Sequence, residues 1–225
     1  MFAGLVLQAA AFAAPLEGIT FAAEPGMLFV PVEEAAKELR WPVQRDDMGK
    51  VYQLNEAALR AGSLRSLTDG TELASTELLA EAGASVSAPD PEGRISVSGG
   101  LFRGFTLVAP AQRVEIDLRK QRLLGWQGER LVLDTRISSG RRGSTPAGEF
   151  IAGPFRSRMH YSSRYQNAPM PWSVQINGHI FVHGFSSVPR YPASHGCIRL
   201  PLDEGNPARF FYEWVQNGTP VRVTK

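Results

Sequence analysis

Hydrophobic positions in the first half of the chain follow a helical period in two places. In "VEEAAKEL", residues 32–39, apolar residues recur at i, i+3, i+4 and i+7, which predicts a helix with one buried face. Glu33 and Glu34 suit the first turn of that helix, and a short strand is predicted before it at 27–30. A second helix is predicted at about 75–82.

Each predicted helix is followed by a hairpin-like stretch, "WPVQRDDMGKVYQL" after the first and "ASVSAPDPEGRISVSG" after the second. The two halves of this region therefore echo one another. We expect residues 18–100 to form a small α+β module, and residues 101–112, "LFRGFTLVAPAQ", to be the joint that follows it.

From residue 113 the pattern changes to the strand period. "RVEIDL" alternates apolar and polar residues, and "RLLGWQGERLVLDTRISSG" predicts two strands around Gln127-Gly128. "SVQINGHIFVHG" predicts a β-hairpin with Asn177-Gly178 as its two-residue turn. These signals indicate a mainly β domain over residues 113–225.

The end of this domain carries a helix signal. Asn206-Pro207 is typical of an N-cap followed by the first helical position, and the helix is expected to run to about residue 216. Asn217-Gly218 stops it, and "TPVRVT" predicts a closing strand. The expected fold is a mainly β catalytic domain with a short C-terminal helix, preceded by the α+β module.

Composition narrows the functional classes. Of 225 residues, 43% are hydrophobic and 20% charged, which argues against disorder. The net charge of +2 suits a protein that works near an anionic polymer. The sequence has no basic run interleaved with aromatic residues, which argues against nucleic-acid binding. A single cysteine excludes an internal disulfide.

The chain starts with "MFAGLVLQAAAFAAPLEG", which has no charged residue before Glu17. Residues 11–13 match an A-x-A cleavage motif, so residues 1–17 are interpreted as a signal segment, although they lack a positive n-region. The alternative is an apolar first strand or helix. Export to the periplasm or cell envelope is the expectation.

The candidate chemistry centres on Cys197 in "YPASHGCIRLP". A buried thiol acting as a small hydrophobic group is one interpretation. The polar, glycine-containing setting "SHGC" equally fits a nucleophile, and from local context both stay open. His183 supplies a second clue, because the predicted hairpin places it at a strand end beside Gly184. The ten residues 184–193 form a loop that can return the cysteine to that strand end.

A Cys–His pair of this kind suits acyl transfer. The imidazole can take the thiol proton, and the N–H groups of Gly196 and Cys197 can donate to a developing oxyanion. A metal site built from His183, His195 and Cys197 is the rival interpretation, but no HExxH or CxxC spacing accompanies it. We expect no metal and no cofactor.

The histidines outside these motifs carry no chemical context in the sequence. His160 and His179 are therefore interpreted as packing or surface residues.

"IFVHGF…PASHGCIRLP" resembles the active-site signature of the L,D-transpeptidase (YkuD-type) catalytic domain. "ISSGRRGSTPAGEF" resembles the upstream block of that family, and "NGTPVRV" its closing strand, so the resemblance covers about residues 113–224. The interval between His183 and Ser194 is shorter than usual in the family, which implies a trimmed lid-like loop. The module resembles, by pattern, the stalk domain first named from the N-terminus of copper amine oxidases.

The resemblance implies roles for single residues. Cys197 would be the acylated nucleophile and His183 its base, oriented through the carbonyl of Gly184. Ser194, His195 and Gly196 would shape the oxyanion region. Arg199 would hold the loop or an anionic substrate group. The fold implied for the domain is the L,D-transpeptidase-type β-sandwich.

The implied reaction acts on peptidoglycan stem peptides as donor and acceptor. Cys197 would form a thioester with a tetrapeptide stem, release D-alanine and pass the acyl group to a second stem, giving a 3-3 cross-link. Water as acceptor would make the protein an L,D-carboxypeptidase or another murein peptide hydrolase. A non-enzymatic wall-binding protein is a further alternative, in which the module binds glycan or another wall polymer.

Overall fold

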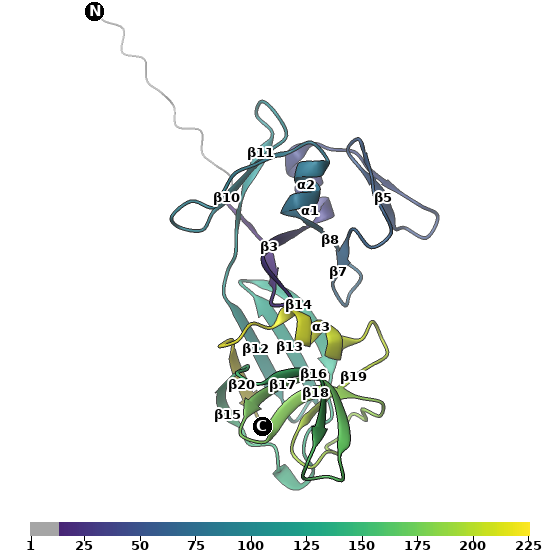
Figure 1. The fold of residues 1–225 in the computed structure, drawn as a ribbon, viewed down its shortest axis with the longest axis vertical. Helices are drawn as coiled ribbons and strands as arrows, with labels where there is room; N and C mark the ends of the chain where they lie inside the picture. The colour runs from purple at the N-terminus through teal and green to yellow at the C-terminus, as the bar shows by residue number, and fades with distance from the viewer. Residues whose placement is uncertain (1–13) are drawn as a thin grey trace, which may run out of the picture.

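The computed structural model describes residues 14–225 and consists of two stacked parts (Figure 1). The upper part in that view is the N-terminal module, and the lower part is the mainly β domain. Most of the predicted signal segment, residues 1–13, lies outside the described residues, whereas Leu16–Glu17 forms the short strand β1. Within 14–225 no helix combines the length and the apolar character that a membrane span requires.

The module is built from two helices and eleven short strands. These are β1 Leu16–Glu17, β2 Ile19–Phe21, β3 Glu24–Pro31, α1 Val32–Leu39, β4 Val43–Arg45, β5 Val51–Leu54, β6 Ala57–Ala58, β7 Arg65–Ser66, β8 Glu72–Ser75, α2 Thr76–Glu81, β9 Ser85–Val86, β10 Ile95–Ser98 and β11 Gly104–Val108. Both predicted helices are confirmed. The second begins after Ser75, whose hydroxyl caps it by accepting the Leu78 N–H at 3.0 Å.

The echo between the halves of the module extends to the order of the elements. The series β2-β3-α1-β4-β5-β6 is followed by an equivalent series, β7-β8-α2-β9-β10-β11. The equivalent strands β3 and β8 pair antiparallel at the centre of a sheet with the order β2-β3-β8-β7. Residues 29–31 pair in reverse order with residues 73–75, with Val30 opposite Ala74. The halves are therefore related by a pseudo-twofold axis that passes between Val30 and Ala74.

The same turn closes the hairpin that follows the helix in each half, β4–β5 and β9–β10. The carboxylate of Asp46 accepts the N–H groups of Met48 and Lys50, both at 2.9 Å. The carboxylate of Asp90 accepts the N–H groups two and four residues further on in the same way, at 3.0 and 2.8 Å. Each half of the repeat therefore has the same kind of turn, in which an Asp carboxylate accepts the N–H groups two and four residues further on.

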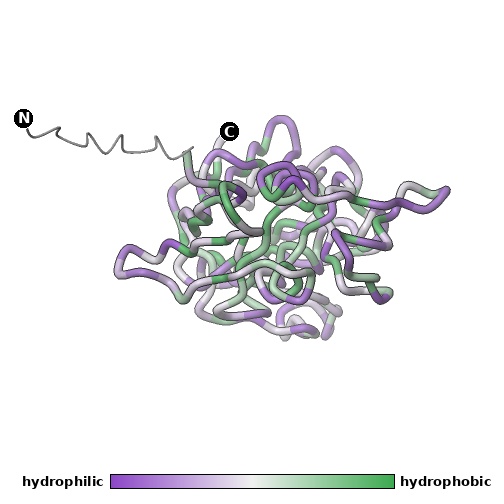
Figure 2. Tube along the Cα trace, turned by 90° about the horizontal axis from the view of Figure 1, so that it is seen from above, coloured by the Kyte–Doolittle hydropathy of each residue, from purple (hydrophilic) through white to green (hydrophobic). Residues whose placement is uncertain are grey.

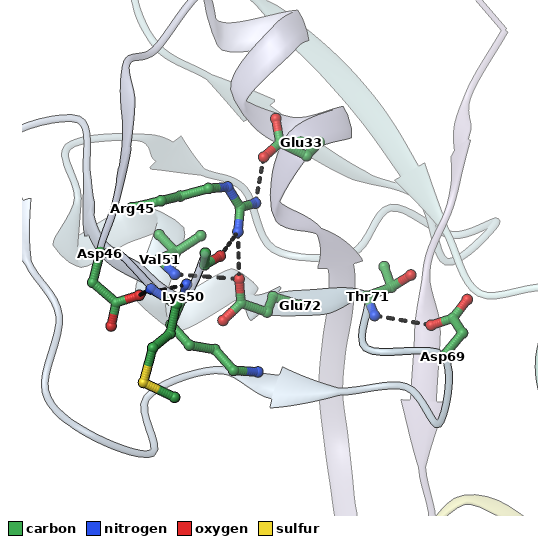
Figure 3. Close-up of polar contacts among 10 residues, drawn as sticks. Glu33, Arg45, Asp46, Lys50, Val51, Asp69, Thr71 and Glu72 are labelled. Carbon is green, nitrogen blue, oxygen red and sulfur yellow. Dashed lines mark hydrogen bonds and ion pairs between the residues drawn. The ribbon is translucent and has the colours of Figure 1, made fainter.

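Arg45 ties the first of these hairpins to the rest of the module (Figure 3). Its guanidinium donates to Glu33 at the start of α1 at 2.5 Å and to Glu72 on β8 at 2.9 Å. Arg45 is partly exposed and Glu33 is exposed, so these pairs contribute modest stability. Their effect is to fix the direction in which the hairpin leaves the module.

The C-terminal part is a β-sandwich with one helix. Its elements are β12 Gln112–Asp117, β13 Arg122–Gln127, β14 Arg130–Arg136, a 3₁₀ turn at Arg141–Gly143, β15 Gly148–Ile151, β16 Arg156–Ser162, β17 Ala168–Asn177, β18 Ile180–Phe185, β19 Ile198–Pro201, α3 Pro207–Trp214 and β20 Pro220–Thr224. One sheet has the order β14-β13-β12-β20-β15 and the other β16-β17-β18-β19. The expected mainly β fold with a short C-terminal helix is confirmed.

Helix α3 completes the core of the sandwich. Asn206 caps it by accepting the Arg209 N–H at 3.0 Å, and Pro207 occupies the first turn, as the sequence predicts. The helix ends at Trp214, two residues before the expected end. Phe211 and Trp214 are fully buried on its apolar face, in the same core as both sheets.

Two local expectations differ from the structure. The segment 101–112, expected to be a joint, contains strand β11, which pairs with β10 and with β1. The hairpin between β17 and β18 turns at Gly178-His179 instead of Asn177-Gly178, because a bulge between Gln175 and Asn177 shifts the register by one residue.

The module and the sandwich share part of their packing. Ile19, Phe21 and Phe29 of the module belong to the same core as the residues of both sheets. A buried amide network continues this contact: Gln127 accepts the Thr20 N–H at 3.1 Å and the Trp214 indole N–H at 3.2 Å. The module is thus packed against the C-terminal end of α3 and shares a core with the sandwich.

Candidate active site

The site lies where strands β18 and β19 run side by side in parallel. His183 is paired with Arg199, and Val182 with Ile198. Because side chains alternate between the faces of a sheet, His183, Cys197 and Arg199 point to the same face. All three line one cavity of about 290 Å³. The two motifs that are separated in the sequence therefore meet at one surface.

His183 is buried inside the strand, and not at its rim as the sequence analysis expected, since β18 continues to Phe185. Its Nδ1 donates to the carbonyl of Gly184 at 2.8 Å, so Nε2 is the unprotonated nitrogen. Burial lowers the pKa of this imidazole to about 4, because the charged form loses its hydration. Above that pH His183 is a neutral base.

Gly184 also allows the helix to come close. A Cβ at this position would lie 2.4 Å from Leu202 and 3.1 Å from the side chain of Ala208 in α3. Gly184 therefore has two roles: its carbonyl orients His183, and its lack of a side chain leaves room for Leu202 and Ala208.

Cys197 has its pKa shifted in the opposite direction. Burial raises the pKa of the thiol, which a hydrogen bond from the Phe181 backbone and the charge of Arg199 partly oppose. The thiol lies 3.6 Å from the carbonyl of His179, its acceptor. A lowered histidine pKa and a raised cysteine pKa together mean that the resting pair is thiol and imidazole, not thiolate and imidazolium.

The loop before Cys197 is held by its own hydrogen bonds. The Ser194 hydroxyl donates to the Cys197 carbonyl at 2.5 Å and accepts the Gly196 N–H at 3.0 Å. The Gly196 N–H, expected from the sequence to be a free oxyanion donor, is therefore already engaged. Gly196 has φ of +150°, and a Cβ there would lie 3.1 Å from Ile180.

The upstream block "ISSGRRGSTPAGEF" supports this loop from behind. The buried Thr145 hydroxyl donates to the Gly196 carbonyl and accepts the Gly140 N–H, both at 2.7 Å. The carbonyl of Ser139 accepts the N–H of Ser194 at 3.0 Å. The upstream block is thus joined to the loop before Cys197 through side-chain and backbone hydrogen bonds, and Thr145 has a structural place within the site.

The contacts of His195 are with Tyr165 and Arg141. Its ring stacks on Tyr165 with centroids 4.3 Å apart, and its Nε2 lies 2.5 Å from the Arg141 guanidinium. Arg199 lies over the ring of Phe185 at 3.9 Å, which fixes its cation beside the cavity.

The structure adds lining residues that sequence reasoning missed. His160 and His179, interpreted from the sequence as packing or surface residues, both line the cavity. The tip of the β16–β17 hairpin, which carries Tyr165, lines it as well. Cover for the site therefore comes from this hairpin, while the loop at 184–193 is short. The only signal in the sequence was the clustering of polar residues in "SSRYQN".

Among residues 14–225, no three His, Cys, Asp or Glu side chains are grouped as a metal centre requires. Two of the three residues of the rival metal interpretation have other partners. His183 donates to Gly184 and His195 contacts Arg141.

Comparison with protein families matches residues 111–223 to the L,D-transpeptidase catalytic domain, YkuD. These residues make up half of the chain and contain the whole site described above. The chain belongs to the L,D-transpeptidase family. Among the curated proteins, no match to this chain was found.

Solved structures similar to this chain include family members from three bacteria. One from Xylanimonas cellulosilytica is 34% identical over 52% of this chain and 61% of its own, with a TM-score of 0.44. One from Stackebrandtia nassauensis is 22% identical over 51% of this chain and 56% of its own, with a TM-score of 0.46. One from Mycobacterium smegmatis is 17% identical over 94% of this chain and 100% of its own, with a TM-score of 0.47. The chain therefore spans little more than half the length of the first two.

Proposed function

We propose that this enzyme transfers the acyl group of a peptidoglycan tetrapeptide stem through a thioester on Cys197. The observation that carries the proposal is that His183 on β18 and Cys197, directly before β19, line one open cavity as a neutral pair. His183 is fixed in the tautomer that exposes a basic nitrogen, which is the form a general base needs.

The first half of the reaction is an attack of sulfur on the carbonyl carbon of the third stem residue. His183 Nε2 takes the thiol proton as the C–S bond forms. The C–N bond to the terminal D-alanine then breaks, and the same proton passes to the departing amine. The products are free D-alanine and a thioester on Cys197.

In the second half an amine on the side chain of another stem attacks the thioester. His183 takes a proton from that amine and returns it to the departing sulfur, which restores the thiol and leaves a 3-3 cross-link. With water as the acceptor the same steps give a carboxylic acid, so the site also supports L,D-carboxypeptidase chemistry.

The surroundings of the pair suit an anionic peptide. Arg164 and Arg199 line the cavity, and its lining contains no acidic residue. Donor and acceptor stems both carry carboxylates, for which guanidinium groups are bidentate partners. We place the enzyme in the periplasm or cell envelope, where this substrate is found, which agrees with the apolar residues 1–13.

The test is D-alanine release from purified disaccharide-tetrapeptide by the wild-type chain and by Cys197→Ala. We expect at least a thousandfold loss in the variant, because no second thiol exists in the chain. Ser163→Ala, which changes another residue of the cavity, is the control and is expected to keep its activity. Release by Cys197→Ala at the wild-type rate would end the proposal.

Intact-mass spectrometry separates binding from chemistry. A carbapenem is expected to add covalently to the wild-type enzyme and not to Cys197→Ala. Muropeptides made from paired stems then distinguish the acceptors: 3-3 dimers indicate transfer, and tripeptides alone indicate hydrolysis.

A further inference from the structure

Positive charge is concentrated in the part of the chain that forms the candidate active site. Hydrophilic residues gather in the outlying loops of the trace (Figure 2), but the sign of their charge differs between regions. Residues 137–201 contain seven arginines and a single acidic residue, Glu149. In the rest of the chain acidic residues outnumber basic ones, 21 to 17. The region around Cys197 is therefore cationic, whereas the remainder of the molecule carries a net negative charge.

The protein itself does not neutralise these arginines. Glu149 pairs with Arg222 on the neighbouring strand β20 at 2.6 Å. Within residues 14–225, none of the seven arginines forms an ion pair with a carboxylate, although nine of the thirteen arginines elsewhere do. Unneutralised charge of one sign around a cavity attracts ligands of the opposite sign. These arginines are thus available to an anionic ligand.

The arginines nearest to the cavity occupy two separate positions. Arg164, at the tip of the β16–β17 hairpin, and Arg199, on β19, line the cavity itself. Arg141 and Arg142 lie on the 3₁₀ turn of the upstream block and are not part of the lining. His195 lies between the two positions, because its ring stacks on the hairpin tip and its Nε2 contacts the Arg141 guanidinium.

The 3₁₀ turn is fixed to the loop that carries the nucleophile. The Arg141 N–H donates to the Ser194 carbonyl at 3.0 Å, and a Cβ on Gly140 would lie 2.8 Å from the Cα of Gly196. Arg142 is exposed and has φ of +54°, in the left-handed region that residues other than glycine seldom adopt. Strained backbone that its surroundings hold in place is common at ligand-binding and active sites. Arg142 is therefore presented on a braced turn beside the loop of Cys197.

Two cationic positions suit an enzyme that joins two anionic peptides. The donor stem must enter the cavity, where Arg164 and Arg199 lie, because its carbonyl carbon has to reach the sulfur of Cys197. An acceptor stem brings its amine to the thioester while the donor still fills the cavity, so its own carboxylates need a cation outside the lining. A hydrolase, whose second substrate is water, has no use for such a position.

We propose that Arg142 binds a carboxylate of the acceptor stem and thereby sets how the thioester on Cys197 is divided between the amine and water. The chemical step stays the same: the amine nitrogen forms the new C–N bond as the C–S bond breaks, and its proton passes through His183 to the sulfur. The inference rests on the proposed function and deepens it, because it names an anionic peptide as the second substrate.

The ratio of 3-3 dimer to tripeptide tests this role. The wild-type chain and Arg142→Glu are incubated with disaccharide-tetrapeptide, which is both donor and acceptor, and the two products are quantified. We expect the ratio to fall at least about tenfold in Arg142→Glu, because an attractive contact with the acceptor becomes a repulsive one. Continued formation of tripeptide shows that the variant is folded. Arg60→Glu makes the same charge change at an exposed position of the module and should keep the wild-type ratio.

An acceptor stem with amidated carboxylates identifies the group that Arg142 binds. With a labelled donor and the wild-type chain, amidation is expected to lower the yield of dimer at least about tenfold. In Arg142→Gln the normal and the amidated acceptor should react equally, since the partner of the carboxylate is already gone. If amidation lowers the yield in Arg142→Gln as much as in the wild type, the carboxylate is bound elsewhere and the proposal is wrong.

The results also separate this inference from the proposed function. An unchanged ratio in Arg142→Glu, with dimers still formed, would remove the role of Arg142 and leave the acyl transfer intact. Tripeptide without dimer from the wild-type chain at every acceptor concentration would likewise overturn the inference, since no acceptor stem would then bind. Failure of the thioester itself is detected independently, by release of D-alanine from Cys197→Ala.

Discussion

Burial shifts the pKa values of His183 and Cys197 in opposite directions, and each shift favours the neutral form of its side chain. Burial lowers the pKa of the imidazole to about 4 and raises that of the thiol. An enzyme with such a pair does not hold a preformed thiolate. In the proposed reaction the nucleophile forms only as the substrate carbonyl is attacked, so the resting site carries no reactive, oxidation-prone thiolate.

This pair predicts the pH dependence of kcat/KM for D-alanine release. The acid limb should lie near pH 4 to 5, because His183 remains neutral down to its lowered pKa. The alkaline limb should lie above the ordinary range of thiols. Steady-state rates from pH 3.5 to 10 measure both limbs, and an acid limb near pH 6.5 would contradict the assigned base.

Folding stability must be followed over the same pH range. The pKa of His183 is lower in the folded state than in the unfolded chain, so protons bind preferentially to the unfolded chain between about pH 6.5 and pH 4. Stability therefore falls as the pH drops through this window, by at most roughly 3 kcal/mol. Circular dichroism at each pH distinguishes loss of the fold from protonation of the base.

At this scale the sequence predicts the residues that belong to local motifs. "SHGC" and "VHG" identify Cys197 and His183 because glycine and the strand pattern constrain a few neighbouring positions. His160 enters the cavity through the pairing of β16 with β17, and Tyr165 enters it through the fold of a hairpin tip. Neither the pairing partner nor the tip conformation is encoded in residues adjacent to them.

At the scale of elements, the tip of the β16–β17 hairpin makes a stacked contact over the site. Tyr165 at its tip lies against His195, 4.3 Å between ring centroids and 15° from coplanar. A contact of this kind contributes about 0.5–1.5 kcal/mol. It connects the cover of the cavity to the loop that carries Cys197.

Tyr165→Ala is therefore expected to raise the KM for the tetrapeptide by about three- to tenfold, with a smaller change in kcat. Tyr165→Phe keeps the ring and should retain the wild-type KM. Tyr161→Ala removes an equally large exposed residue from the same hairpin and serves as the control. Steady-state kinetics of the three variants decide the matter: equal effects of Tyr165→Phe and Tyr165→Ala would remove the stack from the explanation.

Elements with strong local signals were predicted well. The helix at 32–39 has the predicted bounds because its apolar stripe, its two acidic first-turn residues and the Trp41-Pro42 stop agree. Strand β11 was missed because its partners, β10 and the distant β1, are what make it a strand. The turn at Gly178-His179 was misplaced because a bulge is a property of the pairing and not of the turn sequence.

At the scale of the whole molecule, the module and the sandwich are joined by a common core and by charge pairs. Arg130 of β14 donates to both carboxylate oxygens of Glu34 in α1 at 2.8 and 2.7 Å. Arg65 lies 4.2 Å above the ring of Phe21 and donates to Glu213 of α3 at 3.0 Å. Because of these contacts we expect the two parts to unfold as one cooperative unit.

Phe21→Ala tests this coupling. Loss of a fully buried phenylalanine is expected to cost about 3–5 kcal/mol. The whole chain should show a single calorimetric transition, and the variant should shift all of it to lower temperature. Met48→Ala, at an exposed tip, should leave the transition unchanged. Two transitions, with only one moved by Phe21→Ala, would show that the parts unfold independently.

The sequence did not predict this union. Gln112 was the last residue of the expected joint and Gln127 lay at a predicted turn, yet both are buried where they meet Thr20 and Trp214. A buried amide looks like a surface residue until its partners, about a hundred positions away in the chain, are known. The change of hydrophobic pattern at residue 113 predicted a boundary between two folds and gave no information on how tightly they pack.

The pairing of β3 with β8 has a meaning for the origin of the module. A twofold axis between equivalent strands is the arrangement found in a symmetric dimer, in which two copies of one chain complete a sheet together. The module has this geometry within a single polypeptide, as a duplication followed by fusion would leave it. Fusion frees each half from the requirement to match the other. One half could keep its tight β5–β6 turn while the other lengthened the equivalent turn into the hairpin of Leu101 and Phe102.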